Sequence, residues 1–144
     1  MGNKNFIITE KNVSEYCDKI GTWIKNCIES AKADGVVLGM SSGVDCSVVA
    51  RLCQNAGLNT HLIIMPYGED MNNSKNYSDA MELINKFNFN YHIFDIKPTV
   101  DSLQISGDSE ILKSTNEKNI ELSIANIRPR VRMTYLYQYA QLSN

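Results

Sequence analysis

Apolar residues recur every three or four positions near the start of the chain, which is the spacing of an amphipathic helix. This pattern runs from about residue 13 to residue 32 and stops before Gly35. The uninterrupted apolar run VVLGM at 36–40 comes next, and such a run is typical of a strand that is covered on both faces. A second helix is predicted from about Asp45 to Ala56, closed by Gly57.

Strands and helices continue to alternate through the middle of the chain. THLIIM at 60–65 predicts a second strand, and NYHIFDI at 90–96 predicts a third. Between them, the polar residues 72–74 offer an N-cap for a helix that runs through Phe87. The rest of the chain is predicted as a short helix over 99–105, an irregular stretch over 106–117 and a final helix from about Asn126.

This order of elements predicts an α/β protein. Short connections between successive parallel strands require right-handed crossovers, which give a three-layer α/β/α sandwich with a parallel sheet. Open sheets of this kind bind ligands at the carboxyl ends of the strands, where the strand order reverses. No linker divides residues 1–144, so we expect a single domain with its site beginning near Met40, at the end of the first strand.

Composition and charge exclude several classes of protein. With 43% hydrophobic residues the chain can form a packed core, and a net charge of −2 argues against a nucleic-acid partner. No apolar run approaches the roughly 18 residues that cross a bilayer, so no membrane partner is expected. The four cysteines form no CxxC pair and the N-terminal residues lack the apolar core of a secretory signal, which favours free thiols and a cytoplasmic location.

The loop after the first strand carries the strongest chemical signal. Small residues at 41–43 join the buried strand directly to a helix, whose free N–H groups and dipole favour a bound anion. The phosphate-binding patterns GxxxxGKS/T and GxGxxG are both absent. Instead, LGMSSGVDC at 38–46 resembles the SGGxDS pyrophosphate loop of the N-type ATP pyrophosphatases. The longer stretch VVLGMSSGVDCSVVARLCQNAG at 36–57 is similar to the ammonia-dependent NAD synthetases in particular.

Two further segments support this resemblance. DIKPTVD at 95–101 resembles the family's segment after the third strand, and NIRPRVRM at 126–133 resembles the family signature NxxxRxRM. The three segments keep the family order across essentially the whole chain. The resemblance implies a Rossmann-like fold of the adenine nucleotide alpha hydrolase type.

The resemblance also implies a reaction and its ligands. Members of the family make NAD by ATP-dependent amidation of deamido-NAD with ammonia, through an adenylated intermediate and with Mg²⁺. Asn126 and Arg130 are then expected to contact deamido-NAD, and Asp45 to bind Mg²⁺, a role that can coexist with helix N-capping by the same carboxylate. No catalytic side chain is assigned. ATP is expected to bind at Gly39, Met40, Ser41, Ser42, Gly43, Val44, Asp45 and Cys46.

Three positions depart from the family pattern. Ser42 replaces a Gly, which costs on the order of 1 kcal/mol if the backbone there needs a positive φ. Cys46 replaces a Ser, so a weak S–H donor stands in for a hydroxyl, and Ser47 points elsewhere on the helix. Pro129 replaces an Ala and is expected in the first turn of a helix capped by Asn126, where its missing N–H is harmless.

The family's catalytic domain is longer than this chain. Its second half, with the TGNxSE segment and further contacts to ATP, Mg²⁺ and deamido-NAD, has no counterpart here. The family's sheet order 3-2-1-4-5 then leaves the strand at 36–40 as an exposed edge. We therefore expect the N-terminal portion of an NAD synthetase, truncated or split and impaired on its own. We expect a homodimer, or a partner chain that supplies the missing half.

Other functions remain open on the sequence alone. The degenerate loop is also compatible with a non-catalytic nucleotide-binding or regulatory subunit. A tRNA-modifying or GMP-forming enzyme with the same loop is disfavoured by the low charge and by the NxxxRxRM signature. Arg128 is compatible with a solvated helix face or with a ligand contact. The tyrosines at 135, 137 and 139 suit core or dimer-interface packing, and His61 and His92 suit packing or surface roles.

Overall fold

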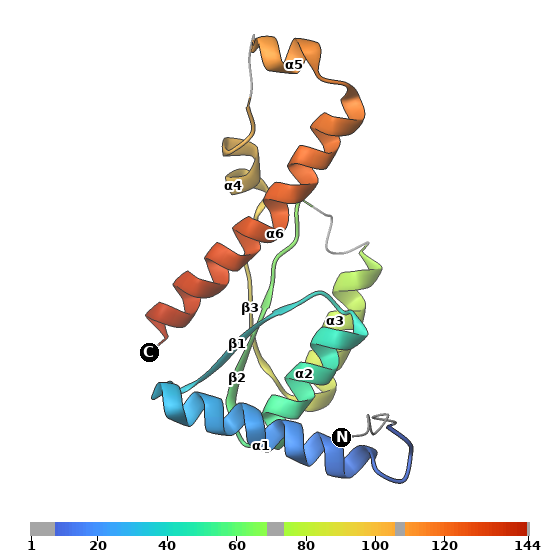
Figure 1. Cartoon of the computed structure of the whole chain (residues 1–144), viewed down its shortest axis with the longest axis vertical. Coiled ribbons are helices and arrows are strands. Elements are labelled where there is room, and N and C mark those ends of the chain that lie inside the picture. Colours follow the sequence, from blue (N-terminus) through green and yellow to red (C-terminus); the bar gives the residue numbers. More distant parts are fainter. Residues whose placement is uncertain (1–7, 69–73, 106–108, 144) are drawn as a thin grey trace, which may run out of the picture.

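A three-stranded parallel sheet lies between layers of helices (Figure 1). The computed structural model describes residues 8–68, 74–105 and 109–143. Met40 pairs with Ile64, and Ile64 with Ile93, so the three strands end at the same edge of the sheet. The strands lie side by side in the order β1 (Gly35–Met40), β2 (Asn59–Ile64) and β3 (Asn90–Ile93).

Helices cover both faces of this sheet. The helices of the described residues are α1 (Val13–Ala31), α2 (Val44–Asn55), α3 (Lys75–Phe87), α4 (Lys97–Ser102), α5 (Glu110–Ser114) and α6 (Glu117–Leu142). Helices α2 and α3 pack on one face, and α6 with the short α4 on the other (Figure 1). α1 packs against α2 at the buried Gly21, where an added Cβ would lie 3.4 Å from the Cβ of Ala56. The predicted three-layer α/β/α fold is confirmed.

Strand β2 shows why polar and apolar residues do not alternate in the apolar runs of this sequence. Leu62 and Ile64 belong to the core cluster under α2 and α3, whereas Ile63 and Met65 belong to the cluster under α4 and α6. Successive side chains of a strand point to opposite faces, so a strand that is covered on both faces is apolar throughout.

Two features of the strands bear on the sequence predictions. Within the described residues β1 pairs with β2 alone, so it lies at an edge of the sheet, as expected. The third strand ends earlier than the predicted 90–96. The N–H of Phe94 still donates to the carbonyl of Ile64, at 3.0 Å, but Asp95 then accepts from the N–H of Lys97, at 2.9 Å. This bond turns the chain into α4.

The prediction for the end of the chain was wrong in two respects. The last helix begins at Glu117 rather than near Asn126, and its N-cap is Asn116, whose side chain accepts from the N–H of Asn119 at 2.9 Å. Pro129 therefore lies inside α6 and not in its first turn, and the helix continues past it. The stretch predicted as irregular contains the short helix α5. Ser74 caps α3, and the other two candidates for that cap, Asn72 and Asn73, lie outside the described residues.

Across residues 8–68, 74–105 and 109–143, no helix combines the length and apolarity that crossing a membrane requires.

Candidate functional site

The loop that joins β1 to α2 forms the centre of the candidate site. Ser42 has a φ of 62°, which lies in the left-handed region. This is the positive φ at which a Ser in place of Gly was expected to be strained. Gly43 is the N-cap of α2, and no side chain accepts a hydrogen bond from the first turn of this helix at the cap. The N-terminal N–H groups of α2 and the helix dipole therefore face the loop, an arrangement that favours an anion.

The thiol of Cys46 lies beneath this loop. Its Sγ is 3.4 Å from the backbone N of Ser41, which donates to it, and 3.1 Å from the carbonyl O of Gly43, to which the S–H donates. The hydroxyl of Ser47 also donates to the carbonyl of Gly43, at 2.9 Å. Ser47 and Cys46, which were expected to point in different directions, thus meet at one carbonyl, but only Cys46 also reaches the N–H of Ser41.

Asp45 follows the loop, two residues after Gly43. It lies in the first turn of α2, its side chain is exposed, and it forms no hydrogen bond or ion pair with the described residues. The N-cap is Gly43, so the interpretation of Asp45 as a plain N-cap is wrong. Within the described ranges no group of three or more His, Cys, Asp or Glu side chains gathers as a metal site. Among the described residues, Asp45 thus offers a single carboxylate and is not part of a preformed cluster of such side chains.

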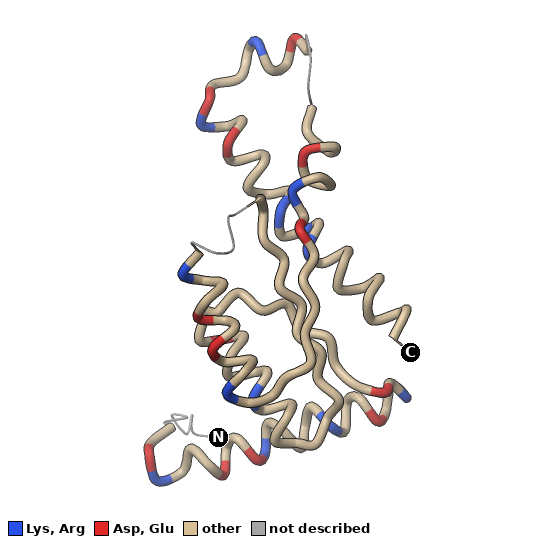
Figure 2. Tube along the Cα trace, turned by 180° about the vertical axis from the view of Figure 1, so that it is seen from behind, with Lys and Arg blue, Asp and Glu red and all other residues tan. Residues whose placement is uncertain are grey.

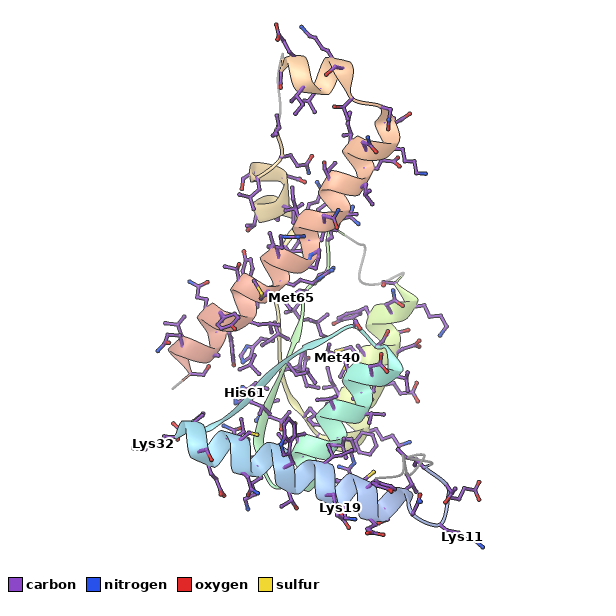
Figure 3. The ribbon with its side chains drawn as sticks, in the orientation of Figure 1. Lys11, Lys19, Lys32, Met40, His61 and Met65 are labelled. Carbon is purple, nitrogen blue, oxygen red and sulfur yellow. The ribbon has the colours of Figure 1, made fainter. Side chains whose placement is uncertain are left out.

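A cavity of about 390 Å³ opens beside the loop, at the carboxyl edge of the sheet. Met40, from the end of β1, and Met65, just after β2, form part of its wall, with Met65 beneath α6 (Figure 3). Apolar groups predominate in the wall, and the polar side chains are few, among them those of Asn76 and Arg132. The lining residues are Gly39, Met40, Ser41, Ile64, Met65, Pro66, Asn76, Tyr77, Ala80, Pro129, Arg132, Met133 and Leu136.

Arg132 ties α6 to the sheet at this cavity. Its Nε donates to the carbonyl of Met65, at 3.1 Å. The contributions of Arg132 and of the α3 residues Asn76 and Tyr77 to the cavity were not foreseen from the sequence. The signature at 126–133 contained a signal for Arg132, whereas nothing in the local sequence marked the two α3 residues.

Asn126 and Arg130 lie one turn apart on the exposed surface of α6. The guanidinium of Arg130 folds back to the backbone carbonyl of Asn126. Neither residue lines the cavity beside the loop. The structure thus places the two residues predicted to bind a second substrate next to each other, and separate from the cavity wall. Asn126 is not an N-cap, because α6 begins nine positions earlier, at Glu117.

Arg128 does not lie on a solvated helix face. Its guanidinium carbon stacks 3.9 Å from the centre of the Tyr67 ring, and its Nε is buried and has no hydrogen-bond partner among the described residues. The hydroxyl of Tyr67 donates to Asp101 at 3.1 Å, and Lys97 forms an ion pair with the same carboxylate. The hydrogen bond from Lys97 lowers the pKa of Asp101. Lys and Arg positions thus lie close together along the backbone where α4 and α6 meet the sheet (Figure 2).

The aromatic residues of α6 serve mainly to pack the sheet. His61 Nδ1 lies 2.9 Å from the hydroxyl of Tyr139, and the hydroxyl of Tyr135 lies 2.8 Å from that of Thr99. Tyr135 and Tyr139 are partly buried against the core, whereas Tyr137 is 73% exposed. The sequence left core and interface roles open for these tyrosines, and the first two have the core role.

Comparison with known proteins gives one consistent result. The family model described as NAD synthase matches residues 16–144. The NH(3)-dependent NAD(+) synthetase of Finegoldia magna is 36% identical over 132 residues, which cover 90% of this chain and 50% of that protein. The chain therefore spans about half the length of this curated relative.

Solved structures agree with the sequence comparison. The structure of the NH3-dependent NAD synthetase from Campylobacter jejuni has a TM-score of 0.76 at 32% identity, covering 91% of this chain and 53% of that one. An NMN synthetase from Francisella tularensis has a TM-score of 0.74 at 31% identity, covering 90% of this chain and 50% of that one.

Proposed function

The chain belongs to the NAD synthase family, and from this membership we propose that it binds ATP at the loop between β1 and α2 and serves NAD biosynthesis. The reaction proposed is the ATP-dependent amidation of deamido-NAD with ammonia. The nicotinate carboxylate attacks the α-phosphorus of ATP, and pyrophosphate leaves. The nitrogen of ammonia then attacks the acyl carbon of the adenylate, AMP leaves, and a proton is released as the amide forms.

One observation carries this proposal: the strand-to-helix loop lies beside an apolar cavity of about 390 Å³. A nucleotide needs an anion site for its phosphates next to an apolar site for its base. The N-terminal N–H groups of α2 supply the first. The cavity between Met40 and Met65 supplies the second, with a volume in the range of small-ligand pockets.

Asp45 suits the metal that such a reaction uses. Mg²⁺ is usually held by one or two carboxylates together with the phosphates of the substrate. Asp45 offers one exposed carboxylate, without a partner among the described residues, at the N-terminus of the helix that faces the phosphates. When bound, the ion neutralises negative charge on the pyrophosphate that leaves.

Asn126 and Arg130 are proposed to bind deamido-NAD. A guanidinium is well suited to the phosphates and ribose hydroxyls of a dinucleotide, since its N–H groups form a planar fork. Arg130 is exposed, and the bond of its guanidinium goes to a carbonyl of its own helix, so its remaining donors face solvent.

The proposed partner is a chain, or a further segment, that supplies the half of the family's length with no counterpart here. Two observations support it. Within the part of the chain that the structure describes, no strand pairs with the outer edge of β1, and β1 has no Pro or charged residue of the kind that usually protects an edge strand. The two helices that flank β1 also carry exposed apolar side chains, namely Val44 and Val48 on α2 and Met133 and Tyr137 on α6. A homodimer is the alternative assembly.

The proposal is tested by calorimetric titration of this chain with Mg·ATP and by assay of NAD formation from deamido-NAD, ATP and ammonia. We expect ATP binding and little NAD from the chain alone, and NAD formation once the second half of a family member is added in trans. A chain that binds neither ATP nor deamido-NAD would contradict the proposal. ATP binding without turnover in the reconstituted mixture would favour a non-catalytic nucleotide-binding subunit.

The nature of the acid substrate is a separate question. One structural neighbour is described as an NMN synthetase, so a mononucleotide is the competing substrate. The reconstitution assay should therefore compare deamido-NAD with nicotinate mononucleotide at equal concentration. We expect the dinucleotide to be preferred.

A further inference from the structure

The thiol of Cys46 bridges the residues before and after Ser42. It accepts from the N–H of Ser41, with N and Sγ 3.4 Å apart, and donates to the carbonyl O of Gly43, with Sγ and O 3.1 Å apart. The Oγ of Ser41 also lies 3.4 Å from the sulfur. One side chain thus spans the peptide units on both sides of Ser42.

Ser42 is the strained residue of this loop. Its φ of 62° is one that residues with a Cβ adopt rarely, and such a conformation persists only where the surrounding structure holds it. Ser47 holds one side of the loop, because its hydroxyl and its N–H both reach the carbonyl of Gly43. Cys46 differs from Ser47 in that its side chain also reaches Ser41, on the other side of the strained residue.

We propose that Cys46 is a positioning residue whose thiol holds Ser42 in its left-handed conformation and so preforms the loop for the phosphates of ATP. The proposal rests on the proposed function of this loop. A loop that already has its bound conformation loses less conformational entropy when the ligand binds, and its affinity is higher for that reason.

Support at residue 46 matters because Ser42 departs from the Gly of the SGGxDS pattern. A Gly in place of Ser42 would adopt the left-handed conformation without strain and would need no support from residue 46. With Ser42 present, the hydrogen bonds of the Cys46 thiol help to hold the strained backbone. The side chain at 46 then offsets the strain that Ser42 introduces, and Cys46 keeps the accepting and donating capacity of the Ser it replaces.

A double-mutant cycle tests this coupling. Mg·ATP affinity is measured by calorimetry for the wild-type chain, S42G, C46A and S42G/C46A. We expect C46A to weaken binding about fivefold when Ser42 is present, and less than about twofold in the S42G background. C46S, whose hydroxyl accepts and donates at the same positions, should recover most of the loss. Equal effects of C46A in both backgrounds would overturn the proposal.

S47A is the matched control, because it removes a hydroxyl that bonds Gly43 on one side of Ser42 only. Amide hydrogen exchange at Ser41, followed by NMR without nucleotide, gives a second readout that does not depend on ATP binding. Faster exchange at Ser41 in C46A than in S47A supports the proposal, and equal exchange overturns it. If the wild-type chain binds no ATP, the proposed function fails, and this exchange measurement still decides the role of Cys46.

Discussion

Arg132 Nε lies 3.1 Å from the carbonyl O of Met65 and donates a hydrogen bond to it across 67 residues of sequence. Met65 comes directly after β2 and is 6% exposed, so this carbonyl lies at the buried edge of the candidate cavity. The bond joins the segment NIRPRVRM at 126–133, on α6, to the residue that follows the central strand β2. It explains how a motif on a distant helix becomes part of a wall that begins at the loop after β1.

Substitution of Arg132 by Ala should destabilise the protein. The carbonyl of Met65 would lose its donor, and an unsatisfied buried polar group costs about 1–3 kcal/mol. Urea unfolding followed by circular dichroism measures the change. R130A is the control, because the Arg130 guanidinium bonds within its own exposed helix face, and it should change the free energy of unfolding by less than about 0.5 kcal/mol. Equal losses in the two variants would contradict the role of Arg132.

Substitution of Asp45 by Asn should weaken the binding of Mg·ATP by about tenfold, because one carboxylate ligand of the metal is removed. ATP without Mg²⁺ should bind the variant at least as well as the wild type, since a negative charge near the phosphates has gone. Calorimetric titrations with and without Mg²⁺ separate the two effects. D18N removes an exposed carboxylate from α1 and serves as the control. An unchanged affinity for Mg·ATP in D45N would show that Asp45 is not a metal ligand.

Removal of the Tyr139 hydroxyl should cost about 1 kcal/mol of stability. That hydroxyl lies 2.9 Å from Nδ1 of His61 at a partly buried position, so Y139F breaks a hydrogen bond that water replaces poorly. Y137F is a matched control on the same helix, because Tyr137 is 73% exposed. Thermal unfolding of both variants provides the comparison. A loss in Y137F as large as in Y139F would contradict this packing.

The ion pair between Lys97 and Asp101 should stabilise the folded protein near neutral pH and lose this contribution in strong acid. The hydrogen bond from Lys97 lowers the pKa of Asp101 from its usual 3.8 in the folded state, so the contribution is present above that value. It is lost as the pH falls through the lower, folded-state pKa.

Unfolding midpoints in urea between pH 5 and pH 2 test this sign. D101N should be less stable than the wild type at pH 5, and the difference should disappear towards pH 2. D18N removes an exposed carboxylate that forms no ion pair with the described residues. Its unfolding midpoint should change with pH in the same way as that of the wild type. A difference between D101N and wild type that grows with acid would contradict the assignment.

The sheet was predictable from the sequence because its signals are local. Residues 36–40 and 62–65 form continuous apolar runs, since residues such as Leu62 and Ile63 are buried on opposite faces of the sheet, and turn residues follow each run. The loop at 41–43 was predictable for the same reason, because strand, loop and helix are consecutive in the chain.

The start of α6 was missed although Ile120, Ile124 and Ile127 recur at helical spacing, because Pro129 was expected in a first turn, which put the start of the helix near Asn126. The Asn116 cap marks where the helix begins, but a single capping residue does not reveal how long the helix beyond it will be. The cavity could not be predicted from local sequence patterns. Its wall combines β1, β2, α3 and α6, and the contact between Arg132 and Met65 depends on tertiary packing. Cys46 illustrates a further limit, because the spacing gave its position in the loop but not its bridge from Ser41 to Gly43.

The most direct test of the account is a ¹H–¹⁵N NMR titration of the chain with Mg·ATP. Binding at the proposed site predicts that the largest chemical-shift changes fall on the amides of residues 39–46, with further changes at Met65 and Tyr77 in the cavity wall. Residues of α1, such as Trp23, should not move. Changes centred away from the loop, or no changes at millimolar Mg·ATP, would contradict a nucleotide site between β1 and α2.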